Sequence, residues 1–152
     1  MKGLVPGIIH TARDRLLRLI FQVHQSPRVA CGSRHVLQFL FSRMSFALPV
    51  QRLRETPTLL AFHHPQQAYP LHILLVPRRA VASLAELDPA LDASFLVDLF
   101  AVVQSLVAEF RLEQSGYRLI VNGGEYQDFP YLHFHLISDK NPPGVIPPPE
   151  IT

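Results

Sequence analysis

The segment YLHFHLIS, residues 131 to 138, places two histidines one residue apart in an otherwise apolar run. Side chains of a strand alternate between its two faces, so His133 and His135 would share one face, roughly 7 Å apart along the strand. Two buried imidazoles need polar partners within the same small volume. Three interpretations are open: hydrogen-bonded core residues, a metal site, or nucleophilic catalysis.

The two functional interpretations make different demands on the rest of the chain. A metal ion needs a third ligand, which His72 or Asp128 could supply, but no spaced Cys or His-Glu signature accompanies them. A neutral imidazole can instead attack phosphorus and form a phosphoramidate, and an unperturbed histidine is largely neutral near pH 7. A second imidazole on the same face would then stabilise charge on the phosphate oxygens. We therefore expect neither a metal nor a cofactor.

These side chains must be positioned by strands. The hydrophobic pattern predicts five strands. Short apolar runs bounded by Pro, Gly and Asn indicate strands at 48–54, 58–63, 72–77, 117–122 and 131–138. A short helix is expected at 81–86. Most connections are too short for crossover helices, which implies an antiparallel sheet and an α+β fold.

A long helix is expected between the third and fourth strands. Asp88-Pro89 resembles an N-cap followed by proline at the first helical position, and the periodicity continues to about Leu112. Its apolar stripe is wide enough to cover one sheet face or to form a dimer seam. The stripe comprises Phe95, Leu96, Leu99, Phe100, Val103, Leu106, Val107 and Phe110.

Composition fits one globular domain with an unevenly charged N-terminal third. The chain has 152 residues, 48% hydrophobic and 17% charged, and its lone Cys31 excludes an internal disulfide. Residues 1–46 carry seven Lys or Arg and one acidic residue on two expected helices, which suggests an anionic partner for this region. No apolar run is long enough to span a membrane. We expect a cytoplasmic protein, with mitochondrial targeting by the Arg-rich start as the alternative.

Several stretches together resemble the histidine-triad (HIT) family. LLAFHHPQQAYPLHILLVPRRAVASLAEL resembles its central segment, YRLIVNGG its phosphate-contacting strand, and YLHFHLI its His-x-His-x-His signature. Order and spacing agree over roughly residues 38 to 140. The resemblance implies a five-stranded antiparallel sheet with one long and one or two short helices. The expected organisation is a basic helical extension at 1–35, the HIT-like domain at 36–140 and a proline-rich tail at 141–152.

The resemblance also implies a function and roles for individual residues. HIT proteins are usually homodimers that act at the α-phosphate of nucleoside phosphoramidates or polyphosphates through a nucleotidyl-histidine intermediate. By position, His133 matches the nucleophile and His135 the histidine that stabilises phosphate or leaving-group oxygens. His72 matches a further active-site histidine, and Asn122 an amide that contacts phosphate. We therefore expect a nucleotide phosphohydrolase or nucleotidyltransferase.

The sequence departs from the family pattern at three positions. Tyr131 stands where the first histidine of the signature belongs, and a phenol cannot become a cation at neutral pH. His64 stands at the usual ribose-binding Asp or Asn, and Asp128 where a Ser or Thr often contacts phosphate. The alternative is therefore a catalytically weakened nucleotide-binding or protein-interaction module. The expected substrate-binding residues are Asn122, His64, Pro65, Gln127, Asp128 and Tyr131.

Overall fold

The computed structural model describes residues 52–65 and 67–142 of the 152-residue chain. The predicted N-terminal helices and the tail from residue 143 lie outside the described residues. The elements, in chain order, are β1 (Arg52–Glu55), β2 (Leu59–His63), β3 (Leu71–Pro77), the 3-10 helix η2 (Leu84–Glu86), α3 (Ala93–Glu109), α4 (Leu112–Ser115), β4 (Arg118–Val121), the 3-10 helix η3 (Gly124–Tyr126) and β5 (Phe134–Ser138).

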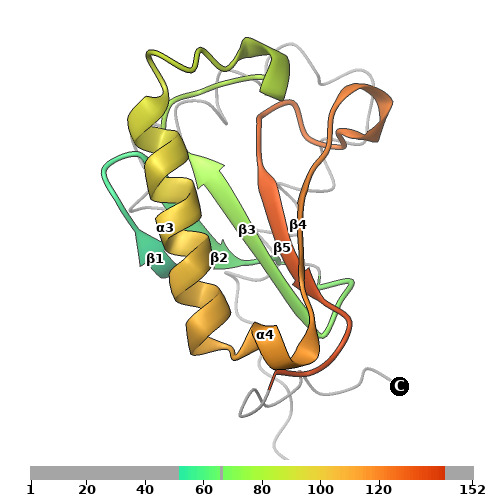
Figure 1. Cartoon of the computed structure of the whole chain (residues 1–152). Coiled ribbons are helices and arrows are strands. Elements are labelled where there is room, and N and C mark those ends of the chain that lie inside the picture. Colours follow the sequence, from blue (N-terminus) through green and yellow to red (C-terminus); the bar gives the residue numbers. More distant parts are fainter. Residues whose placement is uncertain (1–51, 66, 143–152) are drawn as a thin grey trace, which may run out of the picture.

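The strands form one five-stranded sheet in the order β1-β2-β3-β5-β4, and every neighbouring pair is antiparallel (Figure 1). The helical connection through α3 and α4 separates β3 from β4, which allows β5 to pair between them. Strand β3 is central, and all seven of its residues are buried. This arrangement confirms the predicted α+β fold with one long helix.

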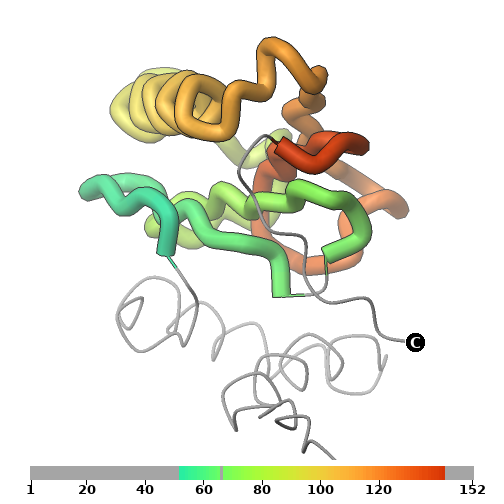
Figure 2. Tube along the Cα trace, turned by 90° about the horizontal axis from the view of Figure 1, so that it is seen from below, coloured from blue at the N-terminus to red at the C-terminus, as the bar shows by residue number. Residues whose placement is uncertain are grey.

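Helix α3 packs along one side of the sheet, as the view in Figure 2 shows. Alternation along β3 directs Leu71, Ile73 and Leu75 toward this helix, and Leu136 does the same from β5. A fully buried aliphatic side chain of this kind contributes about 1.5–3 kcal/mol. The core cluster comprises Leu59, Ala61, Leu71, Ile73, Leu75, Val81, Phe95, Leu99, Val102, Val103, Leu106, Val107, Phe110, Leu112, Leu132, Phe134 and Leu136.

The start of α3 differs from the prediction. The helix begins at Ala93, with Asp92 at the N-cap position, rather than at Asp88-Pro89. The Asp88 carboxylate instead accepts hydrogen bonds from the backbone N–H of Ala90 at 2.8 Å and of Leu91 at 3.3 Å, which closes a turn. Asp and Asn side chains often compete with helix formation in this way.

Other predicted boundaries shift by a few residues. The long helix ends at Glu109 rather than near Leu112, because Arg111 adopts a left-handed conformation with φ of 50°. The described part of the first strand covers 52–55, and the short helix expected at 81–86 is reduced to η2. Strand β5 begins at Phe134, so Tyr131 and His133 belong to the segment before it rather than to the strand.

The predicted apolar stripe of α3 is confirmed except at its outer edge. Phe95, Leu99 and Leu106 are buried, whereas Phe100 keeps 58% of its surface exposed. The helices of the described ranges are all too short or too polar to cross a lipid bilayer.

Candidate active site

Four histidines gather on the sheet face that is turned away from α3. His72 lies in β3 and His135 in β5, at alternate positions to the core-facing Ile73 and Leu136. His64 follows β2 directly, and its backbone N–H donates to the His72 carbonyl oxygen at 2.8 Å. His133 precedes β5. Strand pairing therefore brings together residues that are up to 71 positions apart in the sequence.

The imidazole rings contact one another in a continuous row. The rings of His64 and His72 stack with centroids 4.1 Å apart and an interplanar angle of 12°. His72 Nε2 lies 2.9 Å from His135 Nδ1. The His135 ring then meets that of His133 edge to face, with centroids 4.8 Å apart. The predicted pair of histidines is thus part of a larger cluster.

The tautomer of His133 follows from its backbone partner. Its Nδ1 lies 2.7 Å from the carbonyl oxygen of Tyr131, which can only accept a hydrogen bond. Nδ1 must therefore carry the proton, and Nε2 keeps its lone pair when the ring is neutral. The Phe129 ring approaches the His133 ring edge to face at 6.0 Å and limits its rotation.

The tautomers of His72 and His135 follow in the same way. The backbone N–H of Ala68 lies 3.5 Å from His72 Nδ1 and can only donate, so the proton of His72 is on Nε2. That proton is donated to His135 Nδ1, which places the His135 proton on Nε2. His135 Nε2 is buried and has no hydrogen-bond partner among the described residues. In this tautomer, His135 Nε2 is a hydrogen-bond donor.

Burial keeps these rings neutral. Desolvation, reinforced by the neighbouring histidines, lowers the pKa of His72 to about 3 and that of His135 to about 4. Burial also lowers the pKa of His133, although the Tyr131 carbonyl and the Asp128 carboxylate act in the opposite direction. All three rings are therefore neutral near pH 7. A neutral ring is the form that can act as a nucleophile at Nε2.

The family model described as the HIT domain matches residues 46–141, well over half of the chain. The chain belongs to the HIT family. A HIT-like protein from Buchnera aphidicola is 28% identical over 95 residues, covering 61% of this chain and 84% of that protein.

Solved structures agree with this membership of the HIT family. A HIT family hydrolase from Clostridium thermocellum superposes with a TM-score of 0.58 at 26% identity and covers 77% of this chain and 96% of its own. A histidine triad nucleotide-binding protein from Candida albicans gives a TM-score of 0.57 at 25% identity, with 77% and 85% covered. The fold and the family assignment are therefore supported by both sequence and structure.

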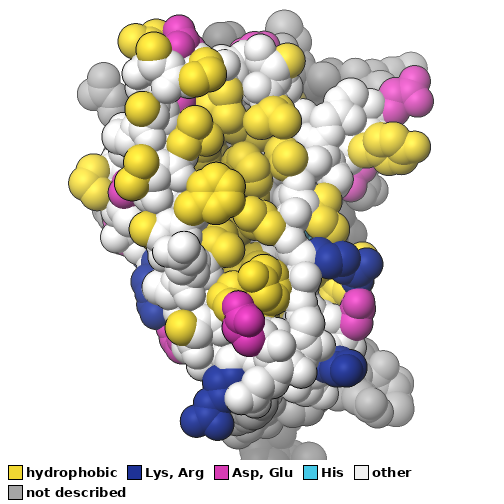
Figure 3. Space-filling view, viewed as in Figure 1, with side chains coloured by type: hydrophobic (Ala, Val, Ile, Leu, Met, Phe, Trp, Pro, Cys, Tyr) yellow, Lys and Arg dark blue, Asp and Glu magenta, His cyan; other side chains and the backbone are white. Residues whose placement is uncertain are grey.

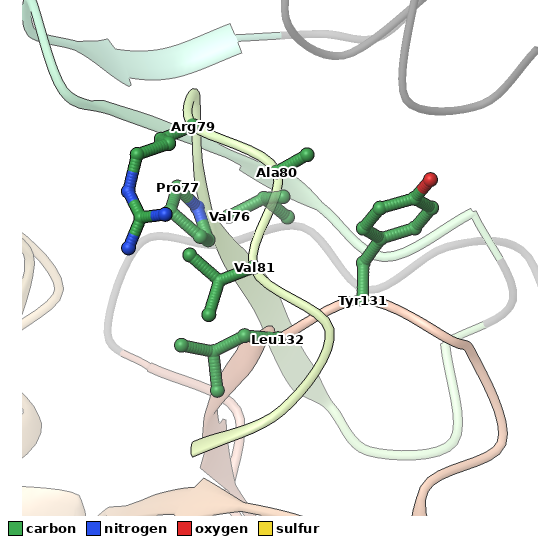
Figure 4. Close-up of a pocket in the computed structure, with 7 residues that line it drawn as sticks. All are labelled: Val76, Pro77, Arg79, Ala80, Val81, Tyr131 and Leu132. Atoms are coloured by element: carbon green, nitrogen blue, oxygen red, sulfur yellow. The ribbon is translucent and has the colours of Figure 1, made fainter. Parts of the chain in front are cut away.

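Tyr131, which the resemblance places at the first histidine of the HIT signature, has a buried side chain. It keeps 8% of its surface exposed, and its ring packs against Phe129 with centroids 5.6 Å apart. It also lines a cavity of about 10 Å³, where Figure 4 shows its ring directed away from Leu132 and Val81. A cavity of that size holds about one water molecule, which excludes a substrate. The backbone carbonyl of Tyr131 contacts the histidine cluster through its bond to His133.

Gln127, predicted to bind substrate, is bonded to the backbone in the structure. Its side-chain amide donates to the carbonyl oxygens of Ala82 at 2.6 Å and of Phe129 at 2.9 Å. These bonds join the loop before β5 to the segment after β3. The backbone bond from Leu132 N–H to the Val81 carbonyl at 2.8 Å reinforces the same junction. Gln127 therefore holds the backbone that carries His133.

The remaining predicted residues surround the cluster. Asn122 is half-buried and follows β4, and extending the Val121–Phe134 pairing by one residue places it opposite His133. Alternation puts it on the histidine face. The exposed Asp128 lies near enough for its charge to act on His133. Pro65 is half-buried directly after His64.

Sequence reasoning missed Tyr69 and Arg118, which border the cluster on its other side. The Tyr69 ring meets His72 edge to face at 5.6 Å, and the Arg118 guanidinium lies 5.8 Å from the Tyr69 ring centroid. Because Ile120 pairs with His135, strand alternation could have assigned Arg118 to the histidine face. Within the described ranges, no group of three or more His, Cys, Asp or Glu side chains is arranged to hold a metal ion.

Proposed function

We propose that this HIT protein transfers or hydrolyses a nucleotidyl group by attack of His133 on the α-phosphorus of a nucleoside phosphoramidate or polyphosphate. The observation that carries the proposal is the bond between His133 Nδ1 and the Tyr131 carbonyl. This bond leaves the Nε2 lone pair available and fixes the ring plane. Burial favours the neutral form of the same ring.

The proposed reaction has two displacements at phosphorus. In the first, a bond forms between His133 Nε2 and phosphorus while the bond from phosphorus to the leaving nitrogen or oxygen breaks, and solvent supplies a proton to that atom. In the second, a water oxygen attacks phosphorus, the bond to Nε2 breaks, and the water proton returns to solvent. The Tyr131 carbonyl stabilises the positive charge that the ring carries between the two steps.

His135 supplies the hydrogen-bond donor that this reaction needs. Its Nε2–H is buried beside His133 and has no partner in the described part of the protein. A phosphoryl oxygen is the acceptor that fits such a donor, and a preorganised donor stabilises the charge that develops in the transition state. His72 fixes the orientation of His135 through the 2.9 Å bond. Asn122, opposite His133, is a second candidate for phosphate contact.

The names of two similar proteins support the substrate class. The Candida albicans protein is described as nucleotide-binding and the Clostridium thermocellum protein as a hydrolase. Neither name specifies a leaving group. The choice of nucleoside phosphoramidates and polyphosphates as substrates rests on the family resemblance of the histidine signature.

A second function is favoured by Tyr131. A phenol cannot become a cation at neutral pH, so Tyr131, whose ring is buried against Phe129, cannot act as a positively charged group beside the phosphate. A nucleotide-binding or protein-interaction module with slow turnover would keep the His133 geometry without the full triad. The proposed enzyme and a nucleotide-binding module differ in the rate of phosphorus–nitrogen cleavage and not in the ability to bind nucleotide.

The direct test measures AMP release from an adenosine phosphoramidate by the wild-type protein and by His133→Ala. We expect release by the wild type and none by the variant, because the nucleophile is lost. His63→Ala is a matched control, since His63 lies on the opposite face of β2 near Phe110. Equal, slow release by the wild type and His133→Ala would reject the catalytic proposal. Saturable nucleotide binding with no release would support the binding module.

We also propose that the chain forms a homodimer through α3 and β4. Val97 and Phe100 on α3 are 69% and 58% exposed, and β4 is an edge strand of the sheet. Figure 3 shows an apolar surface over this side of the molecule. Patches of this kind often mark interfaces. Sedimentation should give a dimer that Phe100→Glu converts to a monomer; a monomeric wild-type protein would reject the proposal.

A further inference from the structure

The His64 side chain stacks on the ring of His72. Its ring lies parallel to that of His72 at 4.1 Å, so one ring face is covered by the neighbouring imidazole. The backbone pairing of the two residues at 2.8 Å fixes their relative position. The ring face that lies on His72 cannot contact a ligand.

The His72 ring is consequently held on several sides. His64 covers a face, the Tyr69 ring approaches edge to face at 5.6 Å, and the two nitrogens lie at the Ala68 N–H and at His135. Flipping this ring would replace both nitrogen contacts with carbon and would disturb the stack. The tautomer of His72 decides in turn which nitrogen of His135 carries a proton.

We propose that His64 is a positioning residue, which by stacking on His72 holds that ring in the orientation and tautomer that make His135 present its Nε2–H to the ligand. The orientation is a property of the free protein. Only the statement that the ligand is a phosphate rests on the proposed function.

The charges around His72 act in the same direction. The titratable groups that face it are His64 after β2, Tyr69 in the β2–β3 loop, His133 before β5 and His135 in β5, with Arg118 of β4 beyond Tyr69. The imidazoles and the guanidinium are positive when charged. Asp128 acts on His133, and Asp139 is paired with Arg118. A proton added to His72 would be repelled by each of these positive groups that is charged, and of these neighbours His64 contributes most to its lowered pKa, after burial.

Two substitutions separate the ring of His64 from its charge. His64→Phe keeps an aromatic ring for stacking and removes the titratable nitrogens, whereas His64→Ala removes both. His63→Phe is the control, because His63 is the preceding residue and its ring contacts Phe110 at 6.3 Å on the other face of the sheet. Side-chain ¹⁵N–¹H correlation spectra of the full-length proteins over pH 5 to 8 report the tautomer and titration of His72.

We expect His72 in the wild type, in His64→Phe and in His63→Phe to be protonated on Nε2 and not to titrate in this range. In His64→Ala we expect both tautomers of His72 and a titration that starts at higher pH. AMP release by His64→Ala should fall on the order of 10- to 100-fold, mainly in kcat, because the donor is misplaced rather than lost. The loss in His64→Phe should be smaller.

Two results would overturn the proposal. One is a His64→Ala protein whose His72 has the wild-type tautomer and pH response. The other is a wild-type or His64→Phe protein with the His72 proton on Nδ1. This second result would reject the proposal even if His64→Ala does not fold. A wild type that releases no AMP would reject the proposed function alone, since the spectra still determine the tautomer.

Discussion

The two faces of the sheet are built from alternate residues of the same strands and differ in almost every other respect. Toward α3, residues such as Ile73 and Leu136 form an aliphatic core. On the opposite face, their neighbours His72 and His135 form a hydrogen-bonded pair. Because side chains alternate between the two faces of a strand, adjacent residues lie in the aliphatic core and in the histidine cluster. Substitutions at adjacent positions should therefore have separable effects.

The largest effect is expected on the aliphatic face, for Leu136→Ala. Leu136 is fully buried against the helix, so the cavity left behind should lower the free energy of unfolding by about 2–5 kcal/mol. Denaturant unfolding measures this loss. Turnover per folded molecule should stay within a few-fold of wild type. A large loss of turnover without a loss of stability would contradict the separation of the two faces.

The neighbouring substitution on the other face, His135→Ala, should show the reverse pattern. Losing the donor at Nε2 should reduce kcat on the order of 10²- to 10³-fold, or about 3–4 kcal/mol of barrier. Unfolding should change much less than for Leu136→Ala, because the imidazole leaves a polar site rather than an aliphatic core. Steady-state kinetics and unfolding on the same samples make the comparison. Unchanged kcat would remove His135 from the proposed mechanism.

A smaller effect is expected at Gln127, which joins the loop before β5 to the segment after β3. Gln127→Ala removes the bonds to the carbonyls of Ala82 and Phe129, at a cost of about 1–3 kcal/mol in unfolding free energy. Because the loop leads to His133, turnover should also decrease, by several-fold. Thermal unfolding and AMP release would record both changes. If kcat falls while the stability is unchanged, Gln127 contacts substrate, as the sequence predicted.

A gradual effect, spread over several pH units, concerns stability. In the unfolded chain histidines protonate below about pH 6.5, whereas the folded-state pKa values of His72 and His135 are about 3 and about 4. The unfolded state therefore binds more protons between pH 6.5 and 4, and stability falls as pH falls through this window. Each group contributes a slope of at most about 1.4 kcal/mol per pH unit. Unfolding curves of His72→Phe should show a flatter dependence; an equal slope would indicate that His72 titrates normally.

The sequence predicted the sheet and the histidine face well because both depend on the alternation of side chains along strands. It could not predict the start of α3, since the choice between Asp88 and Asp92 depends on a distant partner. Arg79 forms an ion pair with the buried Asp92, and the Asp92 carboxylate also accepts from the Asp88 N–H. The local Asp-Pro pattern carries no information about that arginine.

The sequence predicted which residues belong to the candidate site, but not which side chains contact one another. The spacing of His133 and His135 and the family resemblance identified the cluster. The stack of His64 on His72 and the anchoring role of Gln127 depend on side-chain orientation across loops, which no local pattern encodes. Tyr131 illustrates the same limit, because the sequence predicted that it stands at a histidine position, whereas its packing against Phe129 could be seen only in the structure.

The most direct test of the account is the stereochemical course at phosphorus. A nucleoside phosphoramidate made chiral at the α-phosphorus would be hydrolysed by the wild-type protein in isotopically labelled water, and the configuration of the nucleotide product determined. Each in-line displacement inverts phosphorus, so attack by His133 followed by water predicts net retention. Net inversion would mean that water attacks directly and would contradict the role of His133 as the nucleophile.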